Sequence, residues 1–148
     1  MRSTAPRTAG WRERVALPQL GLLGVIAKLD TGARTSALHV AEVEVRVERG
    51  RKRVRFKPLD RDEVCTADLH AERRVRDSGG RSATRCVIVT RLRLDGRSWP
   101  IELTLTSRAT LRYALLLGRS ALADRITVDP GATYLLSAAL PRRRRSRA

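Results

Sequence analysis

The chain has 148 residues, of which 42% are hydrophobic, so it is long enough to form the core of one domain. Lys and Arg outnumber Asp and Glu by 31 to 15, which gives a formal net charge of +16 at pH 7. Such a charge favours binding of nucleic acid or another polyanion, but the arginines are scattered along the chain, so nucleic acid is not expected as the main ligand.

No apolar run reaches the ~18 residues that a membrane span requires, and the first eight residues lack the apolar centre of a signal peptide. We therefore expect a cytoplasmic protein with no membrane contact. Cys65 and Cys86 fit a reducing compartment and are expected to be free thiols.

Turn residues divide most of the chain into short segments that are typical of β-strands. In chain order, we expect strands over residues 11–17, 25–29, 37–48, 54–58, 64–69, 84–94, 99–106, 115–117, 126–128 and 133–136. The clearest pattern lies in residues 37–48, where Val43, Val45 and Val47 alternate with charged residues. This alternation predicts an antiparallel strand with one face buried.

Residues 73–81 form the other local feature that the sequence predicts clearly. They read as a β-hairpin with a Gly-rich tip, and a short helix is expected later, over residues 120–124. Residues 1–9 have no periodicity and half of residues 139–148 are arginine, so both are expected to be disordered tails. The sequence therefore predicts one all-β domain over residues 10–138, but periodicity alone does not distinguish a barrel from a sandwich.

Asp30-Thr31-Gly32 follows the apolar run of residues 25–29, and a second β-prone run follows it. This order places a carboxylate on a tight turn at the end of a strand, where Gly32 allows other groups to approach the backbone. Further along the chain come the Gly-rich hairpin and then an apolar run that ends in Gly118-Arg119. Asp-Thr-Gly, hairpin and apolar-Gly-Arg occur in the same order in retroviral-type proteases, and in those enzymes the last segment packs beneath the catalytic loop.

Four further segments extend this resemblance: residues 11–13, 33–39, 99–106 and 128–130. Together they resemble a bacterial family that carries the label "ATP-dependent zinc protease" but has a retropepsin-like fold. Its members occur alone or linked to RimK-type ATP-grasp ligases, which add glutamates to a ribosomal protein. The resemblance covers roughly residues 10–136. It implies a closed, barrel-like acid-protease lobe, one per chain, and an ATP-grasp ligase as a candidate partner.

An aspartic protease needs two carboxylates that share one proton. The chain carries one Asp-Thr-Gly and is short for two lobes, so a homodimer would have to supply Asp30 twice. The resemblance implies that Asp30, Thr31 and Gly32 are catalytic and that a peptide or protein substrate is bound. The substrate-binding residues that it implies are Ala33, Arg34, Ser78, Gly79 and Gly80.

Two alternatives to this interpretation remain open. Asp30 can simply cap a turn through an Asx-type hydrogen bond, in which case the chain would be a non-catalytic binding or adaptor module. Arg34 can grip a substrate carboxylate, which would favour an acidic peptide, or it can form a structural ion pair with Glu102 or Asp129.

No metal or other cofactor is expected. The chain has no His-Glu-x-x-His, and His39, Cys65, His70 and Cys86 do not have the spacing of a zinc site. Cys65 is more simply a buried thiol and His70 a surface imidazole. The chain also lacks a Gly-x-x-x-x-Gly-Lys loop, so its sequence does not predict ATP binding.

Overall fold

The computed structural model describes residues 5–59, 61–76, 79–107 and 112–137. Within these ranges the fold is all-β, with two single-turn helices, η1 (Pro18–Leu20) and α1 (Arg119–Leu122). The strands in chain order are β1 (Arg7–Gly10), β2 (Arg12–Leu17), β3 (Leu22–Leu29), β4 (Ala37–Glu48), β5 (Arg51–Pro58), β6 (Cys65–Asp68), β7 (Ala71–Arg76), β8 (Ser82–Leu94), β9 (Arg97–Thr106), β10 (Leu115–Leu117) and β11 (Ile126–Asp129).

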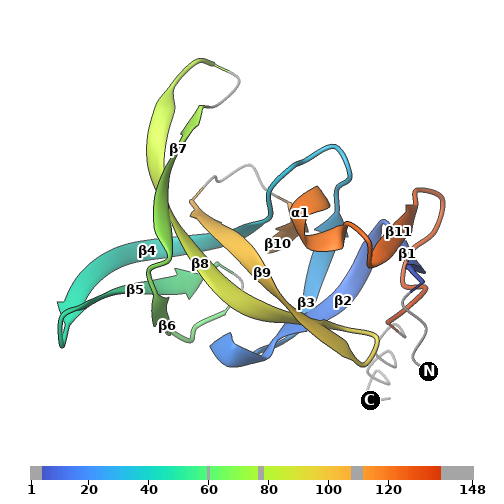
Figure 1. Ribbon diagram of the computed structural model, residues 1–148, viewed down its shortest axis with the longest axis horizontal. Helices are drawn as coiled ribbons and strands as arrows, with labels where there is room; N and C mark the ends of the chain where they lie inside the picture. Colours follow the sequence, from blue (N-terminus) through green and yellow to red (C-terminus); the bar gives the residue numbers. More distant parts are fainter. Residues whose placement is uncertain (1–4, 60, 77–78, 108–111, 138–148) are drawn as a thin grey trace, which may run out of the picture.

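The main sheet closes on itself. Its strand order runs β10-β3-β2-β8-β9-β4, and β10 also pairs with β4, so these six strands form a ring (Figure 1). The short β10 lies between β3, to which it is parallel, and β4, to which it is antiparallel. This insertion brings the end of β3 and the start of β4 to the same edge of the ring, with residues 30–36 connecting them.

The core fills the inside of this ring with Leu, Val and Ile side chains. In β8 and β9 buried and exposed residues alternate, which is the pattern of a sheet with one face on the core. Fully buried side chains from different strands meet there, including Val25, Leu38, Ile88, Leu103 and Leu115. Trp99 closes one end, where its indole N–H donates to the Ala121 carbonyl at 2.9 Å and holds α1 against β9.

The N-terminal segment differs from the sequence expectation. Residues 7–9 were expected to be disordered, but Arg7–Gly10 form β1, which pairs in parallel with β11. The strand forms because small residues pack closely there, and such packing leaves no hydrophobic periodicity in the sequence. Ala9 is fully buried, and a Cβ at Gly10 would lie 2.5 Å from the Ala132 carbonyl oxygen.

The prediction of a strand over residues 133–136 is wrong. This segment is irregular, and its backbone is held by the buried carboxylate of Glu13. Backbone N–H groups of Gly10, Leu135 and Ser137 donate to Glu13 at 2.7, 2.8 and 2.8 Å, and the Ser137 hydroxyl donates at 2.6 Å. Burial raises the pKa of Glu13, but these hydrogen bonds outweigh it, so the pKa lies below its ordinary value.

The burial expected for residues 43–47 is also wrong, although the strand itself is confirmed. The outer parts of β4 and β5 form a hairpin that projects from the ring, which we call the β4–β5 arm (residues 43–54, Figure 1). Val43, Val45 and Val47 are 41%, 41% and 70% exposed. The alternation correctly predicted a strand with two different faces. In this part of the strand, however, neither face packs against another element of the described chain, and the sequence carries no sign of that.

The predicted Gly-rich hairpin is confirmed. β7 pairs antiparallel with the first half of β8, from Ala71 opposite Val87 to Arg76 opposite Ser82, and the hairpin rises away from the ring (Figure 1). Its tip includes Gly80 with φ +82, whereas Ser78 lies outside the described residues, as does the arginine-rich segment 139–148. Within the ranges that the structure describes, no helix is long and apolar enough to cross a bilayer.

Candidate active site

The Asp30 loop begins where β3 leaves the ring. Leu29 N–H donates to the Trp11 carbonyl and Asp30 N–H donates to the Leu117 carbonyl, both at 2.8 Å, so the backbone is fixed up to the carboxylate. Asp30 itself is half-buried, and its Oδ1 accepts a 2.9 Å hydrogen bond from Gly32 N–H. Ala33 N–H closes the turn by donating to the Asp30 carbonyl at 3.2 Å.

The segment after β10 holds this loop from below. Arg119 Nη1 donates to the Thr31 carbonyl at 2.9 Å, and the Arg119 backbone N–H donates to the Ala33 carbonyl at 2.8 Å. Ser120 N–H donates to the Arg34 carbonyl at 3.0 Å, and Gly118 N–H donates to Ser36 Oγ at 3.0 Å. The prediction that the apolar-Gly-Arg segment packs beneath the Asp-Thr-Gly loop is therefore confirmed.

Gly118 is required by this contact. A Cβ at this position would lie 2.4 Å from the Thr35 carbonyl oxygen and 2.8 Å from the Ala33 carbonyl oxygen, closer than real Cβ atoms approach. Only glycine therefore allows the two backbones to lie this close together.

The loop presents its first residues outward. Thr31 and Gly32 are exposed and Ala33 is half-buried. The Gly32–Asp30 hydrogen bond is the Asx-type cap of the non-catalytic interpretation, but it occupies only Oδ1. Oδ2 has no hydrogen-bond partner within the part of the chain that is described, so the geometry is also compatible with a carboxylate that acts on a ligand.

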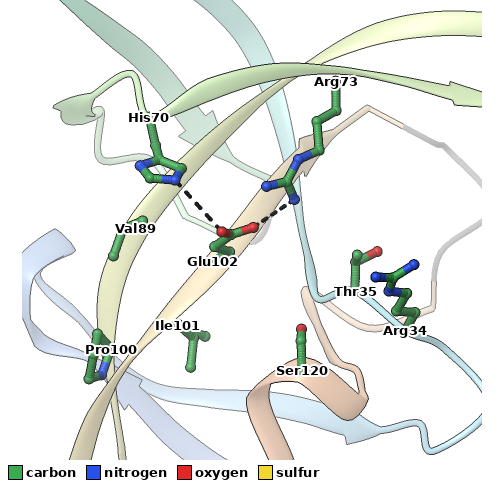
Figure 2. Close-up of a pocket in the computed structure, with 9 residues that line it drawn as sticks. All are labelled: Arg34, Thr35, His70, Arg73, Val89, Pro100, Ile101, Glu102 and Ser120. Carbon is green, nitrogen blue, oxygen red and sulfur yellow. Dashed lines mark ion pairs between the residues drawn. The ribbon is translucent and has the colours of Figure 1, made fainter.

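An open cavity of about 730 Å³ lies beside the loop (Figure 2). The loop, the base of the β7–β8 hairpin, β9 and α1 all contribute to its wall. Its lining residues are Arg34, Thr35, His70, Arg73, Val89, Pro100, Ile101, Glu102 and Ser120. Arg34, one of the expected substrate-binding residues, thus lines a cavity of a size suited to a side chain or short peptide segment.

An ion-pair cluster spans this cavity from the hairpin to β9. Arg73 Nη1 lies 2.6 Å from Glu102 Oε1, and His70 Nε2 lies 3.6 Å from Glu102 Oε2 (Figure 2). The hydrogen bond from Arg73, more than the nearby charge of His70, lowers the pKa of Glu102. Glu102 is therefore an ionised side chain that tethers the base of the hairpin.

This cluster bears on the role of Arg34. Glu102 is paired with Arg73, and Asp129 Oδ1 accepts from Gly131 N–H at 2.9 Å. Across the described ranges Arg34 makes no ion pair with either carboxylate, so the structural ion pair proposed for it is wrong. Its exposed guanidinium remains a positive group on the cavity wall.

The histidines and cysteines considered as metal ligands, His39, Cys65, His70 and Cys86, do not form a cluster. Cys65 is buried with its Sγ 3.5 Å from the Leu20 carbonyl oxygen, and His70 is half exposed, as expected. Burial raises the pKa of both cysteines, which are free thiols, and lowers the pKa of the buried His39. Among the residues with described positions, no three His, Cys, Asp or Glu side chains form a metal-binding group.

The sequence did not reveal the cluster of His70, Arg73 and Glu102. Each residue stands in an ordinary strand or loop position, and the three meet where the base of the β7–β8 hairpin comes close to β9. A long-range contact of this kind leaves no local sequence signal.

Comparisons with known proteins agree with this arrangement. Residues 8–138 match the family described as RimB-like, retropepsin-like aspartic endopeptidase RimB. A crystal structure of a Legionella pneumophila protein of unknown function, Lpg0085 (DUF785), has a TM-score of 0.74 and 28% identity. That likeness covers 90% of this chain and 99% of the other.

Curated relatives are longer proteins named probable alpha-L-glutamate ligase. The relative from Parasynechococcus marenigrum is 40% identical over 134 residues, and the relative from Desulfotalea psychrophila is 37% identical over 132 residues. These matches cover 86% and 85% of this chain but only 28% of each relative. The chain thus spans little more than a quarter of the length of the curated relatives that it matches.

Proposed function

The chain belongs to the RimB-like family of retropepsin-like aspartic endopeptidases, and on that premise we propose that it hydrolyses peptide bonds with an Asp dyad assembled across a homodimer. Each chain supplies one Asp30, and the two-fold axis passes between the two loops. The observation that carries the proposal is the Asp30 loop itself. Its backbone is fixed by Leu117, Gly118 and Arg119, while Thr31 and Gly32 face outward.

The chemistry of such a dyad follows from the repulsion between two close carboxylates. They hold one proton between them, because both cannot ionise at a separation of about 3 Å. The ionised Asp30 takes a proton from water as the water attacks the scissile carbonyl carbon, and the protonated Asp30 polarises the carbonyl oxygen. Collapse of the tetrahedral intermediate breaks the C–N bond, and the leaving nitrogen receives the proton.

The substrate that this site favours is an acidic peptide. Arg34, four residues after Asp30 in the same loop, lines the cavity without a carboxylate partner among the residues described, and a guanidinium pairs well with a carboxylate. Arg73 from the hairpin adds a second positive charge to the cavity wall, although Glu102 offsets it. Main-chain hydrogen bonds from the hairpin tip, including Gly79 and Gly80, would hold the peptide in an extended form.

A second candidate function is a non-catalytic adaptor for a ligase partner. The relatives named probable alpha-L-glutamate ligase favour this adaptor function. The part of each relative that matches this chain is only 28% of its length, so the name describes a much longer protein. In this case Asp30 would serve only as the turn cap seen in its bond to Gly32. A ligase chain of the ATP-grasp type is the partner that this function requires.

Replacing Asp30 with Asn tests the proposed peptidase mechanism. Asp30→Asn keeps the side chain's size and an oxygen acceptor for Gly32 N–H, but removes the shared proton. We expect purified protein to cleave peptides, Asp30→Asn to lower kcat by at least about 10³-fold, and a chelator to have no effect. Activity that survives the substitution and is abolished by a chelator would establish a metalloenzyme instead.

Arg34 tests the substrate class. We expect Arg34→Ala to weaken binding of a glutamate-rich peptide by roughly tenfold, as for the loss of one charge-assisted hydrogen bond, and to leave a neutral peptide unaffected. Arg97→Ala, a charge removed from β9 outside the cavity lining, is the matched control. Equal binding of the acidic peptide by wild type and Arg34→Ala would rule out this role.

A further inference from the structure

Two arginines and two aromatic rings form a continuous stack on the outer face of β2. Arg12 and Arg14 alternate with the buried Glu13 and Val15, so they point away from the core. The Arg12 Cζ lies 5.0 Å from the ring centroid of Trp11 and 5.3 Å from that of Tyr134. Arg14 continues the stack, with its Cζ 5.7 Å from the Tyr134 centroid.

Distant parts of the chain build this stack. Tyr134 is brought to β2 by its N–H, which donates to the Arg12 carbonyl at 2.9 Å, and by the bonds that Glu13 accepts from the following residues. Tyr113 meets the Trp11 ring edge-on, with centroids 6.1 Å apart. The aromatic rings hold the guanidinium planes in place, which reduces the conformational entropy that they lose on binding a ligand.

The charge of this face is not neutralised. Lys28 lies opposite Arg12 in the β2–β3 register. Over the described part of the chain, no carboxylate lies within ion-pair distance of Arg12, Arg14 or Lys28, and all three residues are half-buried. The chain also continues from Ser137, whose hydroxyl accepts from Arg14 N–H at 2.8 Å, into a sequence with five arginines among its last seven residues.

We propose that this β2 face, made of Trp11, Arg12, Arg14, Lys28 and Tyr134, binds single-stranded nucleic acid. The cationic groups bind phosphates, and the rings and guanidinium planes stack with unpaired bases. An acidic peptide would use the charge but gain nothing from the rings, and a duplex keeps its bases stacked inside. This function goes beyond the proposed peptidase activity, because it involves neither Asp30 nor the cavity.

The test is fluorescence anisotropy with a labelled, U-rich RNA of about 12 nucleotides, a length within the usual range of single-strand sites. The same sequence as DNA, its duplex and a glutamate-rich peptide serve as comparison ligands, each over a salt series. We expect the single strands to bind more tightly than the duplex or the peptide. Tyr134→Leu, which changes no charge, should weaken single-strand binding about tenfold, as removal of a stacking ring does.

A charge-matched pair of double variants locates the site. Arg12→Gln with Arg14→Gln should weaken RNA binding at least about tenfold and reduce the salt slope by about 1.4, because each phosphate neutralised on a single strand adds about 0.7 to that slope. Lys52→Gln with Arg55→Gln removes the same charge from exposed positions of β5 and should change affinity by less than about threefold. Arg12→Lys keeps the charge without the planar group, so it should weaken binding while leaving the slope unchanged.

Circular dichroism and thermal unfolding of each variant show whether it is folded. If Tyr134→Leu is not folded, Arg12→Lys provides a second test of the planar groups. The proposal is overturned if the RNA does not bind, if duplex and single strand bind equally, or if the two double variants lose affinity equally. It is also overturned if folded Tyr134→Leu and Arg12→Lys proteins bind RNA as the wild type does, because binding would then reflect diffuse charge alone.

Discussion

Glu13 is the residue that fixes the C-terminal segment to the ring. Its buried carboxylate accepts from the backbone N–H of Gly10, at the end of β1, and from those of residues 135, 136 and 137, which belong to no strand. An unpaired buried N–H is costly, so one side chain here replaces a missing strand. The sequence shows Glu13 only as a charged residue within a short strand, because its partners in the C-terminal segment lie more than a hundred residues away.

Replacing Glu13 with Gln should therefore destabilise the protein strongly. The amide keeps one acceptor oxygen but turns an N–H₂ group toward backbone donors, so we expect a loss of at least about 2 kcal/mol in the free energy of unfolding. Glu63→Gln, the same chemical change at an exposed loop position, should stay within about 0.5 kcal/mol of wild type. Urea denaturation of both variants measures the difference, and equal stabilities would contradict this role.

The same residue predicts a dependence on pH. The pKa of Glu13 is lower in the folded protein than its ordinary value of 4.5. Its stabilising effect is therefore fully present above pH 4.5 and is lost as the pH falls toward the folded-state pKa. In Glu13→Gln this part of the acid sensitivity should be absent, so the stability gap between wild type and variant should narrow on acidification.

At the level of elements, the Asp30 loop and the Gly118–Arg119 segment behave as one unit. Four hydrogen bonds link residues 31–36 to residues 118–120, and the two backbones touch where Gly118 meets Thr35. The sequence predicts this unit well, because its residue types and order are specific. A loop that carries a reactive carboxylate needs such support, since small displacements are costly for catalysis.

Gly118→Ala should disturb this unit selectively. The added Cβ would lie 2.4 Å from the Thr35 carbonyl oxygen, so we expect a destabilisation of about 1–3 kcal/mol and a displaced Asp30 loop. Gly131→Ala is the control, because its Cβ would make an ordinary 3.4 Å contact with Asp129 Oδ1. Thermal unfolding and peptidase assays measure both effects. A fully stable and active Gly118→Ala protein would show that the close contact is not required.

Other elements show where sequence reasoning ends. The alternation of Val43, Val45 and Val47 predicted the strand correctly, but burial depends on a partner face that the β4–β5 arm does not have. Residues 133–136 are β-prone yet irregular, and the Glu13 carboxylate rather than a strand ladder binds the N–H groups of Leu135 and Leu136. Periodicity reports which residues share a face, whereas partners across the fold determine what that face contacts.

At the scale of the molecule, the ring explains why one edge carries the candidate site. Insertion of β10 between β3 and β4 fixes the Asp30 loop at that edge, and the β7–β8 hairpin brings Arg73 over the cavity to Glu102. The all-β class and the loop were predictable from sequence. The cavity and its ion pairs were not, because they depend on contacts between strands that are far apart in the sequence.

A subunit-mixing assay tests the central claim, an Asp dyad shared by two chains, most directly. Wild-type protein is unfolded, refolded with increasing amounts of Asp30→Asn, and assayed for peptide cleavage at constant wild-type concentration. Mixed dimers hold a single Asp30, so activity should fall as the variant is added, to about one half at equal amounts and about one tenth at a ninefold excess. Cleavage that stays constant while the variant is added would contradict a dyad built from two chains.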